Sequence, residues 1–260
     1  FQFIKQEYKP LSRLIFTYVF PFLILYGIVQ VYFQIKIIGN IDLTDPESIM
    51  KDIVPLYLNI FLFSIFGIFV QSLLISSLYS YIEIYVKKGK GNFDLSEITP
   101  LLFSNGLLAL GAGIVYFVIT MIGLMLFVIP GIYFANLFSL VVIVLLFEKR
   151  GLGNALSRSW SLVTSQWWST FLLLLTGIVI TWTMSFVITI PTLTFAAGSE
   201  VLNSMESGPV EQPQSYWVVI GLTTAITSIL WIIPFTFLAF QYFNLVERTK
   251  PVNPYQDSLK

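Results

Sequence analysis

The sequence predicts an all-α polytopic membrane protein with six transmembrane helices, paired as three hairpins, and two amphipathic helices at the membrane interface. Three observations carry this prediction. Hydrophobic residues make up 56% of the 260 residues and charged residues 11%, against about 25% charged in soluble domains. The stretch 98–147 contains no Asp, Glu, Lys or Arg. The basic residues gather on one side of the membrane when the chain is threaded through six spans.

The charge-free stretch 98–147 must enter the membrane, turn and return. One helix of that length would reach about 75 Å, whereas the hydrocarbon core is about 30 Å thick. Gly123, Pro130 and Gly131 are the predicted structural turn, because glycine and proline interrupt helices. The returning span, 131–147, is only just long enough to cross, so the turn can lie below the headgroups instead of emerging fully.

The N-terminal half supplies an amphipathic stretch and the first two spans. Residues 1–13 have helical apolar spacing, typical of either a surface helix or a helical extension of the first span. That span covers 14–38, with a kink expected at Pro21. The second span, 54–81, carries Asn59 and Gln71, whose amides need partners in hydrocarbon. Helix packing is favoured over a polar lining for a small solute.

The third span, 101–123, has a face of small and polar residues along which another helix can approach closely. That face contains Asn105, Gly106, Gly111 and Gly113.

A second amphipathic helix follows the fourth span. Its apolar face carries Leu152, Leu156 and Trp160, and Arg158 occupies the polar face. This pattern predicts an interfacial helix. The fifth span, 168–190, is expected to stop before Pro191, and the sixth, 216–243, to bend at a proline. Residues 1–250 then form one transmembrane domain, and 251–260 form a C-terminal tail.

The basic residues predict the orientation. Twelve of the fourteen lie on the side of the N-terminus and only two on the other. Cytoplasmic loops hold the excess of Lys and Arg, so both termini are expected in the cytoplasm. The basic loops on that side are expected to attract anionic lipids. The twelve residues are Lys5, Lys9, Arg13, Lys87, Lys88, Lys90, Lys149, Arg150, Arg158, Arg248, Lys250 and Lys260.

Composition limits the chemistry. The chain has neither histidine nor cysteine, the commonest general base and the commonest thiolate ligand, so we expect no catalytic residues, no cofactor and no metal site. Balanced acidic and basic totals give no nucleic-acid signal.

Two segments resemble a bacterial family. They are Val128-Ile-Pro-Gly-Ile-Tyr133 and the stretch 146–162, in which an acidic residue and a glycine precede an Ala-Leu-x-x-Ser-x-x-Leu helix. The pattern resembles the membrane domain attached to some glycerophosphodiester phosphodiesterases and related six-span inner-membrane proteins. The start, Phe3-Ile-Lys-x-x-Tyr-Lys-Pro-Leu11, is similar to members from the Bacteroidetes. The resemblance implies an inner-membrane module without catalytic residues, since the phosphodiesterase activity belongs to a separate soluble domain that this chain lacks.

Three functions remain open at this stage. The first is a non-catalytic scaffold or accessory subunit that binds other membrane proteins, favoured by an expected absence of buried ionisable groups. The second is a transporter or channel for a small neutral or lipidic solute. The third is an intramembrane enzyme, for which the sequence offers almost no suitable residues.

Overall fold

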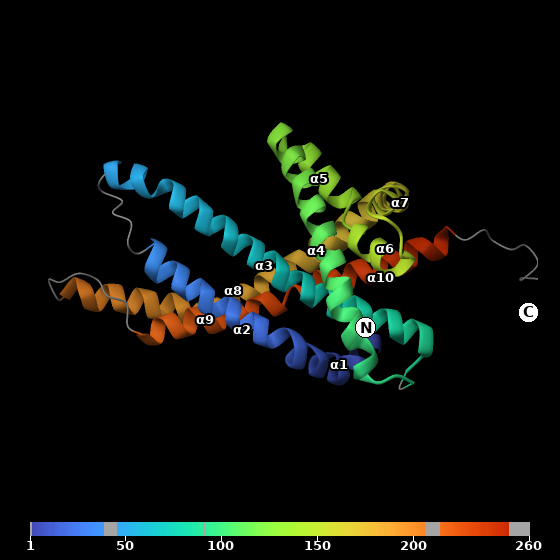
Figure 1. Ribbon diagram of the computed structural model, residues 1–260, viewed down its shortest axis with the longest axis horizontal. Coiled ribbons are helices and arrows are strands. Elements are labelled where there is room, and N and C mark those ends of the chain that lie inside the picture. The colour runs from blue at the N-terminus through green and yellow to red at the C-terminus, as the bar shows by residue number, and fades with distance from the viewer. Residues whose placement is uncertain (1, 39–45, 91, 206–213, 250–260) are drawn as a thin grey trace, which may run out of the picture. The chain divides into compact units, whose positions relative to one another are not determined.

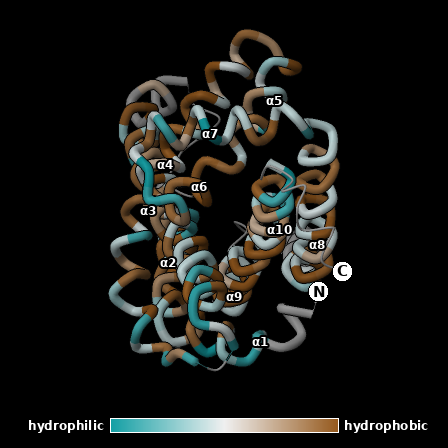
Figure 2. The backbone as a smooth tube through the Cα atoms, turned by 90° about the vertical axis from the view of Figure 1, so that its right-hand side faces the viewer, coloured by the Kyte–Doolittle hydropathy of each residue, from teal (hydrophilic) through white to brown (hydrophobic). Residues whose placement is uncertain are grey.

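Helices joined by short turns make up nearly all of the part that the computed structural model describes, residues 2–38, 46–90, 92–205 and 214–249. Six helical segments are long and apolar enough to cross a membrane, which confirms the predicted all-α, polytopic class. Figure 2 shows hydrophobic residues along most of the helical course. The tail predicted at 251–260 lies outside the described residues. The six segments are Glu7–Lys36, Ile53–Lys88, Leu95–Leu126, Val128–Glu148, Trp167–Thr194 and Ser215–Arg248.

The first segment is one uninterrupted helical course. It consists of α1 (Gln2–Leu14), the π-helix η1 (Ile15–Val19), α2 (Phe20–Phe33) and the π-helix η2 (Gln34–Ile38). No loop separates α1 from α2, which matches the helical-extension alternative for the N-terminal stretch. The distortion expected at Pro21 is the π-helical turn of η1 just before it, because proline has no N–H to donate to the preceding turn.

The second and third segments are long helices joined by a short connection. α3 (Pro46–Lys88) ends at Gly89, whose φ of 80° lies in the left-handed region that glycine adopts without a steric penalty. An ion pair between Lys88 and Glu97 links the end of α3 to the first turn of α4 (Leu95–Leu126).

α4 and α5 (Val128–Leu137) form a tight hairpin (Figure 1). A single extended residue, Phe127, separates them. A Cβ on Gly123 would lie 2.9 Å from the Cα of Gly131, so both glycines permit the close approach. Pro130 is the third residue of α5, where a missing N–H breaks no helical bond. The turn itself is at Phe127, between the predicted Gly123 and Pro130-Gly131, which lie in the helices on either side of it.

The fourth segment is two helices and not the single helix predicted over 131–147. α5 ends at Leu137, and α6 (Val141–Glu148) begins after a turn over 138–140. Ser139 Oγ donates to the Asn136 carbonyl at 2.8 Å, a local bond that competes with helix continuation.

α7 (Leu152–Thr164) is followed by the long helix α8 (Trp167–Met205). The prediction that the fifth span stops before Pro191 is wrong, because α8 continues for fourteen residues beyond it. Neighbouring groups offset the cost of proline inside membrane helices. Here Thr192 Oγ1 lies 3.1 Å from Thr223 Oγ1 of α9 (Gln214–Ile229), which fixes α8 against another helix just past the proline.

Pro234 interrupts the sixth segment, as expected, and the chain forms a turn between α9 and α10 (Ile232–Arg248). Proline cannot donate to the Leu230 carbonyl, and Thr181 Oγ1 of α8 donates to that oxygen at 3.4 Å. Gln71 Nε2 of α3 donates to the Ser228 carbonyl at 3.3 Å. Polar side chains of two other helices thus satisfy backbone groups at the break.

Contacts divide the chain into two compact units, 1–110 with 180–232 and 111–179 with 233–260. In the first unit, α2 and α9 cross at two glycines: a Cβ on Gly27 would lie 2.4 Å from the Gly221 carbonyl oxygen. This crossing was not predicted from the sequence. The core beside it consists of buried aliphatic side chains from α1 to α4 and α9, among them Leu14, Val19, Leu23, Leu73, Leu74, Leu102 and Ala225.

Candidate functional site

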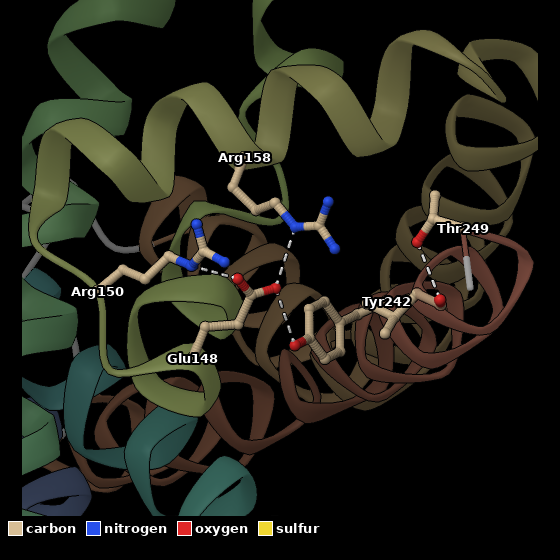
Figure 3. A network of polar contacts seen from close by, with 6 residues as sticks. Glu148, Arg150, Arg158, Tyr242 and Thr249 are labelled. Atoms are coloured by element: carbon tan, nitrogen blue, oxygen red, sulfur yellow. Dashed lines mark hydrogen bonds and ion pairs between the residues drawn. The ribbon is translucent and has the colours of Figure 1, made fainter. Parts of the chain in front are cut away.

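Glu148 is the centre of a polar network in the second unit (Figure 3). It is the last residue of α6, and Lys149 follows in a left-handed conformation (φ 51°) that turns the chain toward α7. Arg150 Nε lies 2.6 Å from Glu148 Oε2, and Arg158 Nε donates to Oε1 at 3.2 Å. Tyr242 Oη of α10 donates to the same oxygen at 3.3 Å. One carboxylate therefore connects three helices.

This network carries a net positive charge at the end of an apolar helix. Two guanidinium groups share one carboxylate, whose side chain is 15% exposed, while those of Arg150 and Arg158 are 49% and 27% exposed. Charge-assisted hydrogen bonds to a partly buried carboxylate are stronger than those between neutral groups. The arrangement fixes the start and the middle of α7 against the end of α6.

The predicted amphipathic helix exists as α7, and one of its faces is buried in the protein. Ala155, Ser159, Leu162 and Val163 are buried. Ser159 Oγ donates to the Leu137 carbonyl at 2.7 Å, which satisfies an oxygen at the end of α5. α7 is therefore packed against α5 and α6 and is not a helix held by lipid alone.

The four residues predicted for the interfacial helix have different surroundings. Leu152 and Leu156 are half-buried, and Arg158 turns to Glu148. Trp160 is 41% exposed, and its ring lies 5.8 Å from that of Phe138 between centroids. Only the tryptophan keeps the half-exposed placement typical of a membrane interface.

The predicted polar and small-residue face of the third span is realised over part of its length. Asn105 Nδ2 donates to Ser80 Oγ of α3 at 2.9 Å. A Cβ on Gly106 would lie 3.1 Å from Leu73 Cδ2, also of α3. Gly111 and Gly113, by contrast, have no atom within 4 Å of such a Cβ, so the packing expected there is not met by the described residues.

Asn59 and Gln71 do not form a common polar lining. Asn59 Nδ2 donates to the carbonyl of Pro55 in its own helix at 2.8 Å. Gln71 reaches the Ser228 carbonyl of α9, while its own carbonyl oxygen is buried without a hydrogen-bond partner among the described residues. The two amides lie twelve residues apart on α3, about 18 Å along the helix axis. Asn59 therefore bonds within its own helix, whereas Gln71 joins α3 to α9.

Two buried glutamates contradict the expected absence of buried ionisable groups. Glu7 is 4% exposed and Glu83 7%. Tyr81 Oη donates to Glu7 Oε2 at 2.5 Å, and Lys90 Nζ lies 3.9 Å from the other oxygen. Lys87 Nζ lies 2.7 Å from Glu83. The burial of Glu7 could have been predicted from helical spacing, because Glu7 lies on the same helix face as Leu11 and Leu14, at i+4 and i+7.

The cavities near these residues are apolar. Asn59 lines one of about 320 Å³ between α2 and α3, otherwise surrounded by aliphatic and aromatic side chains. Tyr133, Trp167 and Trp168 line another of about 410 Å³. Within the described ranges, no three acidic side chains are grouped closely enough to hold a metal ion.

The fold and these contacts define a multi-pass helical membrane protein in which polar side chains join helices to one another. No protein-family model matches the chain, and no curated protein or solved structure matches it. The resemblance to the membrane domain of glycerophosphodiester phosphodiesterases stays a prediction from the sequence pattern, over about residues 128–175 and at the start, 3–11.

Proposed function

We propose that the protein is a non-catalytic integral membrane scaffold, an accessory subunit of a larger complex in a bacterial inner membrane. The observation that carries the proposal is the use of its intramembrane polar groups. Ser76, Asn105, Gln71 and Thr181 all bond to neighbouring helices. These bonds between helices stabilise the fold of the chain, and of the four side chains Gln71 keeps a carbonyl oxygen without a partner among the described residues.

The same proposal includes the orientation. The segregation of twelve of the fourteen basic residues supports cytoplasmic termini. On that side, Lys87 and Lys88 are largely exposed and pair with glutamates, and anionic lipid headgroups are their expected further partners.

One helix face is suited to a neighbouring subunit. Around Gly111 there is open space within the described protein. The apolar side chains of Ile114 and Val118, on the same stripe as Gly111, are 44% and 47% exposed. Small residues permit close backbone approach between membrane helices, so another protein helix can pack here more closely than on α8.

Crosslinking tests this face directly. A photoreactive phenylalanine analogue at Ile114, in the full chain in its native membrane, should give one adduct of defined mass. Native mass spectrometry after extraction into lipid nanodiscs should show the same partner at fixed stoichiometry. Gly111→Leu should abolish the adduct, whereas Thr176→Leu, at an exposed position on α8, should not. Lipid adducts alone, with a monomer by mass, would contradict a scaffold.

A second candidate function is transport of a small neutral or lipidic solute. The buried, unpartnered carbonyl oxygen of Gln71 is the specific observation in its favour. Flux into proteoliposomes that falls with Gln71→Leu, while the protein stays monodisperse, would favour a transporter over a scaffold. Equal flux in both variants would remove Gln71 from any path.

A further inference from the structure

The tip of the α4–α5 hairpin is a run of exposed apolar side chains. Met125, Phe127 and Ile129 are 85%, 76% and 82% exposed, and Leu126 and Val128 are exposed as well. The nearest charged residues in the sequence are Glu97 and Glu148. Contiguous apolar surface of this kind is costly in water and stable in hydrocarbon. The question is how deep in the membrane the tip lies.

Contacts fix α5 beside the first turn of α8. The ring of Tyr133 stacks on that of Trp167, with centroids 5.6 Å apart. Asn136 Nδ2 donates to the Trp167 carbonyl at 2.9 Å. Ile129 and Ile132 line the cavity of about 410 Å³ whose other wall is Trp167 and Trp168. Residues from the beginning to the end of α5 therefore lie near the first residues of α8.

The first residues of α8 mark one surface of the membrane. Tryptophan is enriched at that depth, and the charged network of Glu148 lies at the same end of the α8–α10 pair. Gln241 Nε2 of α10 donates to Thr170 Oγ1 of α8 at 2.9 Å, and the adjacent Tyr242 donates to Glu148. Asn136 and Glu148 are thus both held at one end of these two helices.

Helix geometry then limits the depth of the tip. Nine residues separate Asn136 from Phe127, which is at most about 14 Å of helix, less than half of a hydrocarbon core of about 30 Å. α6, with eight residues, spans about 12 Å. A straight crossing from the opposite surface to Glu148 is incompatible with the anchor at Asn136.

We propose that the α4–α5 hairpin is a wedge in one leaflet: its tip lies among the acyl chains of the leaflet in which α8 begins and does not reach the opposite surface. Length and composition permit these segments to cross, and the contacts of α5 are what restrict them. A hairpin that enters and returns leaves every other segment on its predicted side, so the distribution of basic residues agrees with this arrangement. The proposal does not depend on the scaffold function.

Spin-label depth measurements test it, and the absence of cysteine allows single-cysteine variants of the full chain. Phe127→Cys carries the nitroxide, and Leu172→Cys, Leu175→Cys and Phe186→Cys on α8 form a depth ruler. Their positions are about 8, 12 and 28 Å along the helix from Trp167. Collision rates with oxygen and with a neutral nickel chelate are measured in phosphatidylcholine–phosphatidylglycerol vesicles.

The label at Phe127 should collide freely with oxygen and report a depth of at most about 14 Å below the level of Trp167, close to that of the Leu175 label and far short of that of the Phe186 label. A depth equal to that of the Phe186 label, or strong collision with the nickel chelate, would overturn the proposal. Weak collision with both reagents would also overturn it, because the tip would then be covered by a second copy or another protein. Met125→Cys repeats the test if Phe127→Cys gives aggregated protein, and unchanged ruler depths report correct folding.

Discussion

Replacing Gly27 by alanine should destabilise the protein, whereas the same replacement at Gly111 should not. The new methyl group at residue 27 would lie 2.4 Å from the Gly221 carbonyl oxygen, a backbone atom that no rotamer change can move away. Ordinary contact begins near 3.4 Å, so α2 and α9 must separate by about 1 Å at their closest point. Overpacking of this kind costs about 1–3 kcal/mol.

The gain in helix propensity from glycine to alanine is about 1 kcal/mol and acts at both sites. At residue 27 it offsets part of the overpacking, which leaves a net destabilisation of up to about 2 kcal/mol. At residue 111 nothing lies within 4 Å of the added methyl, so stability should stay constant or rise by up to about 1 kcal/mol.

Steric-trapping or denaturant unfolding in bicelles measures both variants against the unmodified chain. Gly27→Leu should extend the loss further, since a longer side chain forces a wider separation. Equal free energies of unfolding for Gly27→Ala and Gly111→Ala would refute the close crossing of α2 and α9.

Three further predictions concern the polar contacts. Glu148→Gln removes the negative charge shared by Arg150 and Arg158, and trypsin should then cleave after both arginines several-fold faster. The control is Glu97→Gln, at the exposed pair with Lys88, which should change cleavage after Lys88 little. Ser159→Ala leaves the Leu137 carbonyl without its side-chain donor and should lower the free energy of unfolding by about 1–3 kcal/mol, with the exposed Ser157→Ala as a near-neutral control. Thr181→Val should lower the free energy of unfolding in the unmodified chain, because the Leu230 carbonyl loses its donor. In a Pro234→Ala background the same substitution should have almost no effect, since alanine supplies an N–H for that carbonyl. Additive effects in the double-mutant cycle would exclude Thr181 as the substitute donor.

The sequence was sufficient to predict the helical class and the approximate limits of six apolar segments, because hydropathy and length are properties of each segment alone. The place of the hairpin turn, between Gly123 and Pro130, followed from local chemistry in the same way. Pro191 shows where such reasoning stops: a proline usually ends a helix, yet α8 continues past it where Thr192 meets Thr223 of another helix. That compensation involves a residue thirty-one positions away and leaves no local signal.

The buried glutamates show a second limit. Glu83 has a lysine one helical turn away, which predicts a solvated surface pair as readily as a buried one. Its burial depends on which face of α3 meets the other helices, a question of helix packing that one amphipathic pattern cannot answer. The burial of Glu7 could have been predicted from the helix face that it shares with Leu11 and Leu14. Its hydrogen-bond partner was not predicted.

The segment pattern over residues 128–162 can now be explained residue by residue, and each part has a packing role. Gly131 permits the close turn with Gly123, Glu148 binds Arg158 and Tyr242, and Ser159 satisfies the end of α5. Ala155 and Leu162 fill the buried face of α7. A pattern whose members all position helices predicts an architecture and says nothing of a reaction. These packing roles support the proposed structural role, and the contacts of the exposed faces are where that proposal is tested.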